Sequence, residues 1–114
     1  MIKISKLLLK ILTIGTAHAI TLYPFIILKN NNLKTNSTLI NHEKIHLKQQ
    51  IELLIIPFYI LYLFEYIIRR FQYSTHHEAY CNISFEREAY KNQTNLDYLY
   101  HRKFWSFRSY FIEK

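Results

Sequence analysis

The sequence predicts a mainly α-helical fold in a single domain, and three features of its composition lead to this prediction. The chain has 114 residues, which is enough for one hydrophobic core but not for two. Half of the residues are hydrophobic and 17% are aromatic, so we expect a packed interior. One glycine and two prolines disfavour a turn-rich β-sandwich or β-barrel. The single glycine also excludes glycine-rich phosphate-binding loops.

The domain (1–114) begins with a basic and apolar segment, residues 1–29, ahead of a core at about 36–95 and an aromatic, basic tail at 96–114. Residues 1–19 have the layout of a secretory signal peptide, with lysines before an apolar stretch and a small-x-small triplet after it. We favour a retained amphipathic segment instead, because Lys10 divides the apolar stretch. β-branched and aromatic residues then predict a short strand near 25–28.

A first long helix is expected after the polar break at 30–32, from Thr38 to about Pro57. A side chain of the Asn36-Ser37-Thr38 triplet can cap its first turn. Pro57 ends or kinks this helix, or begins the next one.

A second helix, Phe58 to Arg70, is apolar on nearly every side, which predicts burial on most sides within a small bundle. Insertion in a membrane, or contact with its surface, is the alternative for this segment. A third helix begins at Thr75-x-x-Glu78, which has the capping-box pattern, and ends between Asn92 and Asn95. The tail is expected to be a packing segment.

The charge balance is basic, with 15 Lys and Arg against 8 Asp and Glu. The cations are scattered, and no recognition helix or base-stacking platform is present, so a nucleic-acid partner is not expected. We expect a solvated or membrane-contacting surface, and a membrane-associated or cytoplasmic location rather than a secreted protein. The single cysteine, Cys81, excludes an internal disulfide framework and a cysteine-based zinc site, and is expected to be a small, at least half-buried apolar residue.

The chemistry of the chain is concentrated in His42-Glu43-x-x-His46 on the first predicted helix. Residues i and i+4 share one face of a helix, about 6 Å apart along its axis, so both imidazoles can reach one tetrahedral Zn²⁺. Glu43 points beside the metal, where it can act as the general base. Two exposed surface histidines are the alternative interpretation. A zinc peptidase also needs a third protein ligand, for which residues 85–90 are the best candidate stretch.

Together with the later Glu86-x-Glu88-Ala89, this motif resembles the gluzincin zinc peptidases. The resemblance is to HtpX-type and CAAX prenyl protease catalytic cores and to their single-domain relatives, the minigluzincins, and it covers about residues 38–90. It implies a compact helical zincin-like core in which Glu86 is the third zinc ligand. Tyr90 stands where the family has aspartate, so Glu78, Glu88 or a backbone carbonyl would have to orient the ligating imidazoles.

Other residues near the second motif have weaker claims on the site. Glu78 is the second choice for the third ligand, and Glu88 lies about 200° around the helix from Glu86, on another face. His76 and His77 are expected to be exposed in a first helical turn. Tyr90 and His101 are candidates for the donor that stabilises a transition-state oxyanion.

The sequence therefore predicts a zinc-dependent metallopeptidase that hydrolyses peptide or protein substrates through a zinc-activated water, with Glu43 as general base. The resemblance implies that the strand near 25–28 offers an edge to an extended substrate. The alternative is a non-enzymatic, small, basic helical protein that acts at a membrane.

Overall fold

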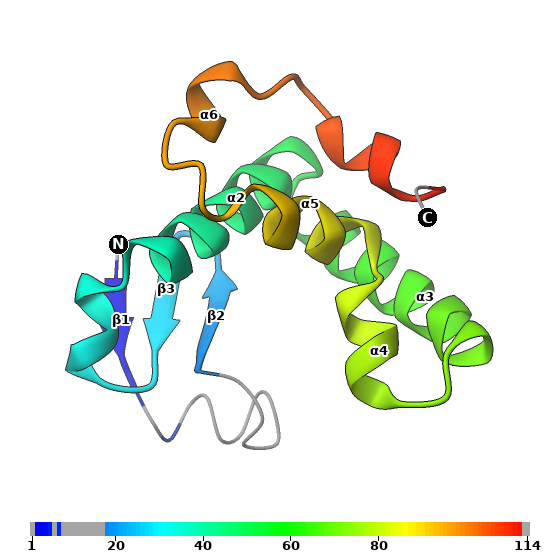
Figure 1. Cartoon of the computed structure of the whole chain (residues 1–114), viewed down its shortest axis with the longest axis horizontal. Helices are drawn as coiled ribbons and strands as arrows, with labels where there is room; N and C mark the ends of the chain where they lie inside the picture. Colours follow the sequence, from blue (N-terminus) through cyan, green and yellow to red (C-terminus); the bar gives the residue numbers. More distant parts are fainter. Residues whose placement is uncertain (1, 6, 8–17, 113–114) are drawn as a thin grey trace.

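A small sheet and a set of helices make up the chain, and the computed structural model describes residues 2–5, 7 and 18–112 (Figure 1). The sheet lies at one end of the molecule beside the helix of residues 37–52, and the helices of residues 56–72 and 76–81 extend to the other end. The elements are β1 (Ile2–Ile4), β2 (Ala19–Leu22), β3 (Phe25–Leu28), η1 (Asn31–Thr35), α2 (Ser37–Glu52), α3 (Ile56–Gln72), α4 (His76–Cys81), α5 (Ser84–Asn92), α6 (Tyr98–His101) and η2 (Ser106–Tyr110).

The strand predicted near 25–28 is confirmed as β3, which has β1 parallel on one side and β2 antiparallel on the other. Its β-branched side chains suit a buried strand, and Ile26, Ile27 and Leu28 are buried. Because both sides of β3 are paired, the prediction that residues 25–28 offer an edge to a substrate is wrong. The apolar stretch and the small-x-small triplet of the expected N-terminal segment fall mostly on residues 8–17, outside the described residues.

The outer edge of β2 is bound by a side chain from α2. The amide of Gln50 donates from Nε2 to the carbonyl oxygen of Thr21 at 2.8 Å, and its Oε1 accepts from the N–H of Tyr23 at 2.9 Å. Gln50 thus makes the two hydrogen bonds that a residue of a further strand would make. These contacts join the sheet to α2.

The first long helix is confirmed as α2, and the side chain of Asn36 caps it by accepting from the N–H of Leu39. It ends at Glu52, earlier than predicted, because the chain reverses through Leu54 and Ile55, which both have positive φ angles. Pro57 lies in the first turn of α3, where its missing N–H costs no hydrogen bond. Among the described residues, no helix is by itself long and apolar enough to cross a bilayer; α2 and α3 meet that test only as a pair bent by 113°, on length and composition alone.

The second predicted helix is confirmed as α3, but its expected burial on most sides is wrong. Only Phe58, Glu65 and Arg69 are buried, because neighbouring elements cover one face of α3. The opposite face is exposed and apolar.

The third predicted helix begins as expected, since the hydroxyl of Thr75 accepts from the N–H of Glu78. It is two helices, however, and not one. The chain leaves the helical conformation at Ile83, whose side chain enters the core, and α5 starts at the next residue. The carboxylate of Glu65 on α3 accepts hydrogen bonds from the N–H and the hydroxyl of Ser84, and so caps α5 from another element.

The tail packs against the helices, as predicted. Phe107 of η2 joins Phe58, Ile83 and Phe85 in one hydrophobic cluster. Arg102 enters the interior and pairs with the carboxylates of Glu52 and Glu88.

Candidate metal centre

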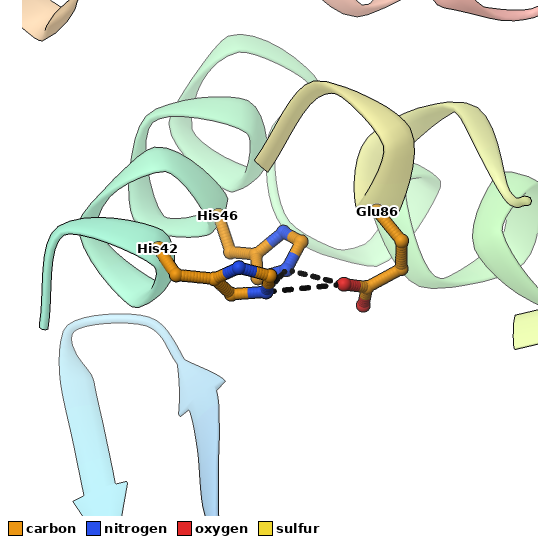
Figure 2. Close-up of side chains that lie close together, drawn as sticks. All are labelled: His42, His46 and Glu86. Carbon is orange, nitrogen blue, oxygen red and sulfur yellow. Dashed lines mark hydrogen bonds and ion pairs between the residues drawn. The ribbon is translucent and has the colours of Figure 1, made fainter. Parts of the chain in front are cut away.

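Three side chains from two helices converge where the sequence motifs predict a metal site. His42 and His46 lie one turn apart on α2, and Glu86 lies in the first turn of α5. Figure 2 shows the three side chains pointing toward one another. The Nε2 atoms of the two histidines are 3.2 Å apart, and Oε1 of Glu86 is 3.2 Å from that of His42 and 3.0 Å from that of His46.

These separations suit a tetrahedral zinc ion. Bonds of about 2.0–2.1 Å at tetrahedral angles place the ligand atoms about 3.3–3.4 Å from one another. The three separations between the ligand atoms of His42, His46 and Glu86 are 3.0 to 3.2 Å, close to this value. Two imidazole nitrogens and one carboxylate oxygen form a donor set that Zn²⁺ favours. His42, His46 and Glu86 are therefore close enough together to hold a metal ion.

Two glutamine side chains hold the imidazoles with Nε2 toward the centre. Gln49 Oε1 lies 2.8 Å from Nδ1 of His46, and Gln93 Oε1 lies 2.8 Å from Nδ1 of His42. Gln49 Nε2 donates to the Phe85 carbonyl and to Glu88, so its Oε1 is the atom that faces His46. An amide oxygen only accepts, so Nδ1 of each imidazole carries a proton and Nε2 can present a lone pair.

Two neutral imidazoles and a carboxylate would bring three lone pairs together, which is favourable only with a cation between them. Desolvation lowers the pKa of His46, but the carboxylates of Glu86 and Glu43 outweigh it and raise that pKa to about 9. Burial raises the pKa of Glu86, yet the adjacent His46 and His42 outweigh burial and hold it below its usual value. Without metal, a proton on His46 is the cation at neutral pH, and a metal ion must displace it.

The second oxygen of Glu86 has a partner of its own. The hydroxyl of Tyr62, on the inner face of α3, donates to Glu86 Oε2 at 2.6 Å. This hydrogen bond leaves Oε1 as the oxygen that faces the two imidazoles. The first turn of α5 also favours a negative charge, because the unpaired N–H groups of a helix start carry partial positive charge.

Glu43 lies beside the three ligands without joining them. Its Oε2 is 3.9 Å from Nε2 of His42, and its Oε1 accepts from the hydroxyl of Thr21 on β2 at 2.8 Å. Burial raises the pKa of Glu43, while the two histidines and Thr21 act in the opposite direction. A buried carboxylate with a raised pKa, next to the ligand cluster, is suited to accept and return a proton.

The remaining candidates are divided between the site and the surface. Tyr90 is 41% exposed, and its ring lies edge-on against that of His42, with centroids 4.5 Å apart. His101 is exposed on α6 and takes no part in the site's hydrogen bonds within the described chain. Glu78 is exposed and bonds Ser74 and Thr75, so its choice as the alternative third ligand is wrong.

His76, His77, Cys81 and Glu88 lie outside the ligand cluster. His76 and His77 are exposed, as predicted, and Cys81 is half-buried. Glu88 is buried on a different face of α5 from Glu86 and reaches His46 only through Gln49.

Sequence reasoning missed the four residues that orient the site: Thr21, Gln49, Tyr62 and Gln93. Gln49 has a local signal, because it follows His46 by three residues and therefore shares its helix face. Gln93 has one as well, because it follows Glu86 by seven residues, about two helical turns. Thr21 and Tyr62 come from β2 and α3, and no spacing in the sequence relates them to His42 or Glu86.

Comparison with known proteins adds no relative. No protein-family model, curated protein or solved structure matches the chain. What supports a metal centre in this chain is the geometry of His42, His46 and Glu86 and of the groups that orient them.

Proposed function

We propose that the chain is a zinc-dependent peptidase whose metal is held by His42, His46 and Glu86. The observation that supports this most directly is the convergence of three buried ligand atoms beside a carboxylate, Glu43, that is not one of them. A purely structural zinc site has no need of such a carboxylate, whereas hydrolysis needs a proton acceptor at this position.

When bound, Zn²⁺ acts as a Lewis acid that polarises a peptide carbonyl and lowers the pKa of water. Glu43 takes the proton of the attacking water and returns it to the nitrogen of the leaving amine. Thr21 holds one oxygen of Glu43, so the other oxygen is directed toward the ligand cluster for this transfer. Gln49 and Gln93 keep the imidazole lone pairs on the metal side throughout.

A second candidate function is a structural metal site. His42, Glu43, His46 and Glu86 are each at most 6% exposed, and closed burial of this kind is common where a metal only stabilises a fold. In that case, Glu43 would serve as a hydrogen-bonded anchor for β2.

The test compares two carboxylate-to-amide substitutions, Glu43→Gln and Glu78→Gln. The purified chain should contain one zinc per molecule by elemental mass spectrometry and cleave members of a quenched-fluorescent peptide library. Glu43→Gln should retain the metal and lose cleavage by about 100-fold or more, because the proton acceptor is gone. Glu78→Gln changes an exposed carboxylate on α4 and should keep both properties.

Three outcomes would contradict the peptidase. A chain without stoichiometric metal removes the metal centre, and cleavage that survives Glu43→Gln removes the mechanism. Stoichiometric zinc in a chain that cleaves none of the library favours the structural site.

A further inference from the structure

The outer face of α3 carries a continuous apolar stripe. We define the outer stripe as Ile56, Ile60, Leu63, Phe64, Ile67 and Phe71, which are between 48% and 89% exposed. At 100° per residue these six side chains cover an arc of about 100° along the whole length of the helix. Patches of this kind on a protein surface mark sites of contact with a partner or a membrane.

α3 differs from a helix at a protein–water boundary, because it buries Phe58 in the core but has no polar side chain on its outer stripe. Its inner side carries Tyr59, Tyr62 and Glu65, whose polar atoms bond Thr21, Glu86 and Ser84. A helix facing water has its apolar side on the core and its polar side outward. Every exposed residue of α3 before Arg70 is apolar, so this face is suited to an apolar medium.

The apolar surface continues from α3 onto the tail. Phe64 and Leu61 line a cavity of about 390 Å³ together with Phe111, and Arg108 lies at the same cavity. Near the start of α3, the indole N–H of Trp105 donates to the carbonyl oxygen of Glu52. This hydrogen bond places the exposed aromatic pair of Phe104 and Trp105 close to the first turn of the helix. Tryptophan and basic residues beside an apolar face are typical of helices that lie in the membrane interface.

The charge on the surface is more positive than the composition suggests. Seven of the eight acidic residues lie in the described chain, and the buried carboxylates among them are those of Glu43, Glu52, Glu65, Glu86 and Glu88. Only Glu78 and Asp97 of the described acidic residues are exposed. Arg70, Lys103 and Arg108 are exposed beside the stripe or on the tail segment that adjoins it. Cations next to an apolar face complement the negative potential of an anionic lipid surface.

We propose that the outer stripe docks the chain onto an anionic lipid bilayer, with α3 lying in the plane of the interface and Arg70, Lys103 and Arg108 facing the headgroups. The stripe supplies the apolar contact and the cations supply the attraction to the surface. Binding is reversible, because a single interfacial helix of this size does not span the bilayer. Docking does not depend on the metal centre, since the stripe faces away from Glu86.

The experiment mixes the full-length, metal-loaded chain with sonicated vesicles and follows co-flotation and the fluorescence of Trp105, the only tryptophan. Vesicles of phosphatidylcholine with phosphatidylserine are compared with vesicles of phosphatidylcholine alone. We expect the chain to float with the anionic vesicles, with a blue shift of Trp105 emission and quenching by brominated acyl chains. Binding to the uncharged vesicles should be much weaker.

Matched variants locate the contact. Leu63→Gln lies on the stripe, and Leu96→Gln makes the same change at a residue of similar exposure, 60% against 54%, away from it. Leu63→Gln should weaken vesicle binding about tenfold, because it removes one side chain of apolar burial, and Leu96→Gln should leave binding unchanged. Arg70→Gln should weaken binding to the anionic vesicles about fivefold. Because these side chains are exposed, circular dichroism and zinc content should match those of the unchanged chain.

Failure of this inference is distinct from failure of the peptidase. The inference is overturned if the chain ignores anionic vesicles, or if Leu63→Gln and Leu96→Gln weaken binding equally. It is also overturned if sedimentation shows a dimer that Leu63→Gln dissociates while vesicles do not bind, because a second copy then covers the stripe. The peptidase is tested separately, by zinc content and peptide cleavage, and none of these vesicle results contradicts it.

Discussion

The hydrogen bond from Tyr62 to Glu86 decides which carboxylate oxygen faces the imidazoles. Tyr62 donates to Oε2, and Oε1 lies 3.0 and 3.2 Å from the two Nε2 atoms. Burial and the negative charge of Glu86 raise the pKa of Tyr62 well above its ordinary value, so the hydroxyl remains a donor across the working pH range. The phenol thereby limits Glu86 to one ligand atom.

Tyr62→Phe should weaken zinc binding by about tenfold, because groups that orient metal ligands typically contribute 10- to 100-fold in affinity. Competition with a chromophoric chelator measures this. Tyr66→Phe is the matched control, since Tyr66 lies one turn further along α3 and its hydroxyl bonds the exposed His76. Equal affinities for the two variants would show that Tyr62 does not orient Glu86.

For single residues, the sequence predicted the ligands of the candidate site better than the groups that orient those ligands. His42 and His46 are linked by helical periodicity, and Glu86 by its resemblance to a family motif, so all three were identified. Tyr62 and Thr21 are brought to the site by the packing of α3 and β2. Tertiary contacts of this kind leave no pattern in a single sequence.

Among the elements, α5 depends on α3 for the position of its first turn. The residue before α5, Ile83, has no side-chain hydrogen bond to give, and Glu65 of α3 binds Ser84 instead. Glu65 also pairs with Arg69, one turn along its own helix. Glu86 follows two residues after Ser84, so the cap helps to place a proposed metal ligand.

Glu65→Gln should lower the free energy of unfolding by about 2–3 kcal/mol, because it removes the charge that balances the buried Arg69 and weakens the cap on Ser84. Chemical denaturation of the metal-free chain measures this without a contribution from zinc. Glu78→Gln removes an exposed carboxylate in a cap and should cost about 1 kcal/mol or less. A smaller loss for Glu65→Gln than for Glu78→Gln would contradict the role of Glu65.

The helices were predictable where their signals are local. Asn36, Pro57 and Thr75 mark helix starts through their own chemistry, and each lies where that chemistry predicts. The break between α4 and α5 was missed because its cap comes from Glu65, nineteen residues earlier. β1 and β2 were missed because short strands gain their stability from pairing with β3.

Across the whole molecule, Arg102 links the tail to both helices of the candidate site. Its guanidinium reaches Glu52 at the end of α2 and Glu88 on α5, and all three side chains are at most 2% exposed. Glu88 in turn accepts from Gln49, which holds His46. A chain of contacts therefore runs from the tail to the proposed metal ligands.

Arg102→Met should destabilise the chain by about 3–5 kcal/mol, because it leaves two carboxylates buried without a cation. Arg108→Met removes an exposed guanidinium of the same tail and should change stability by about 0.5 kcal/mol or less. Thermal unfolding with a chelator present compares the two. If the two variants unfold alike, the buried network does not anchor the tail.

The mainly helical fold could be predicted from composition, because one glycine leaves few ways to make tight hairpins. The exposure of α3 could not be predicted, since an apolar segment is compatible with burial by protein or by lipid. Five buried carboxylates were also unforeseen. Their partners, such as Arg102 and Ser84, become neighbours only after folding.

The contact of Gln50 with β2 limits how copies of the chain can associate in concentrated solution. An exposed strand edge with unpaired N–H and C=O groups can recruit a strand of another molecule and begin an ordered aggregate. Gln50 occupies the carbonyl of Thr21 and the N–H of Tyr23, and Tyr59 also donates to that carbonyl. Two side chains thereby protect this stretch of the sheet from growth by strand addition.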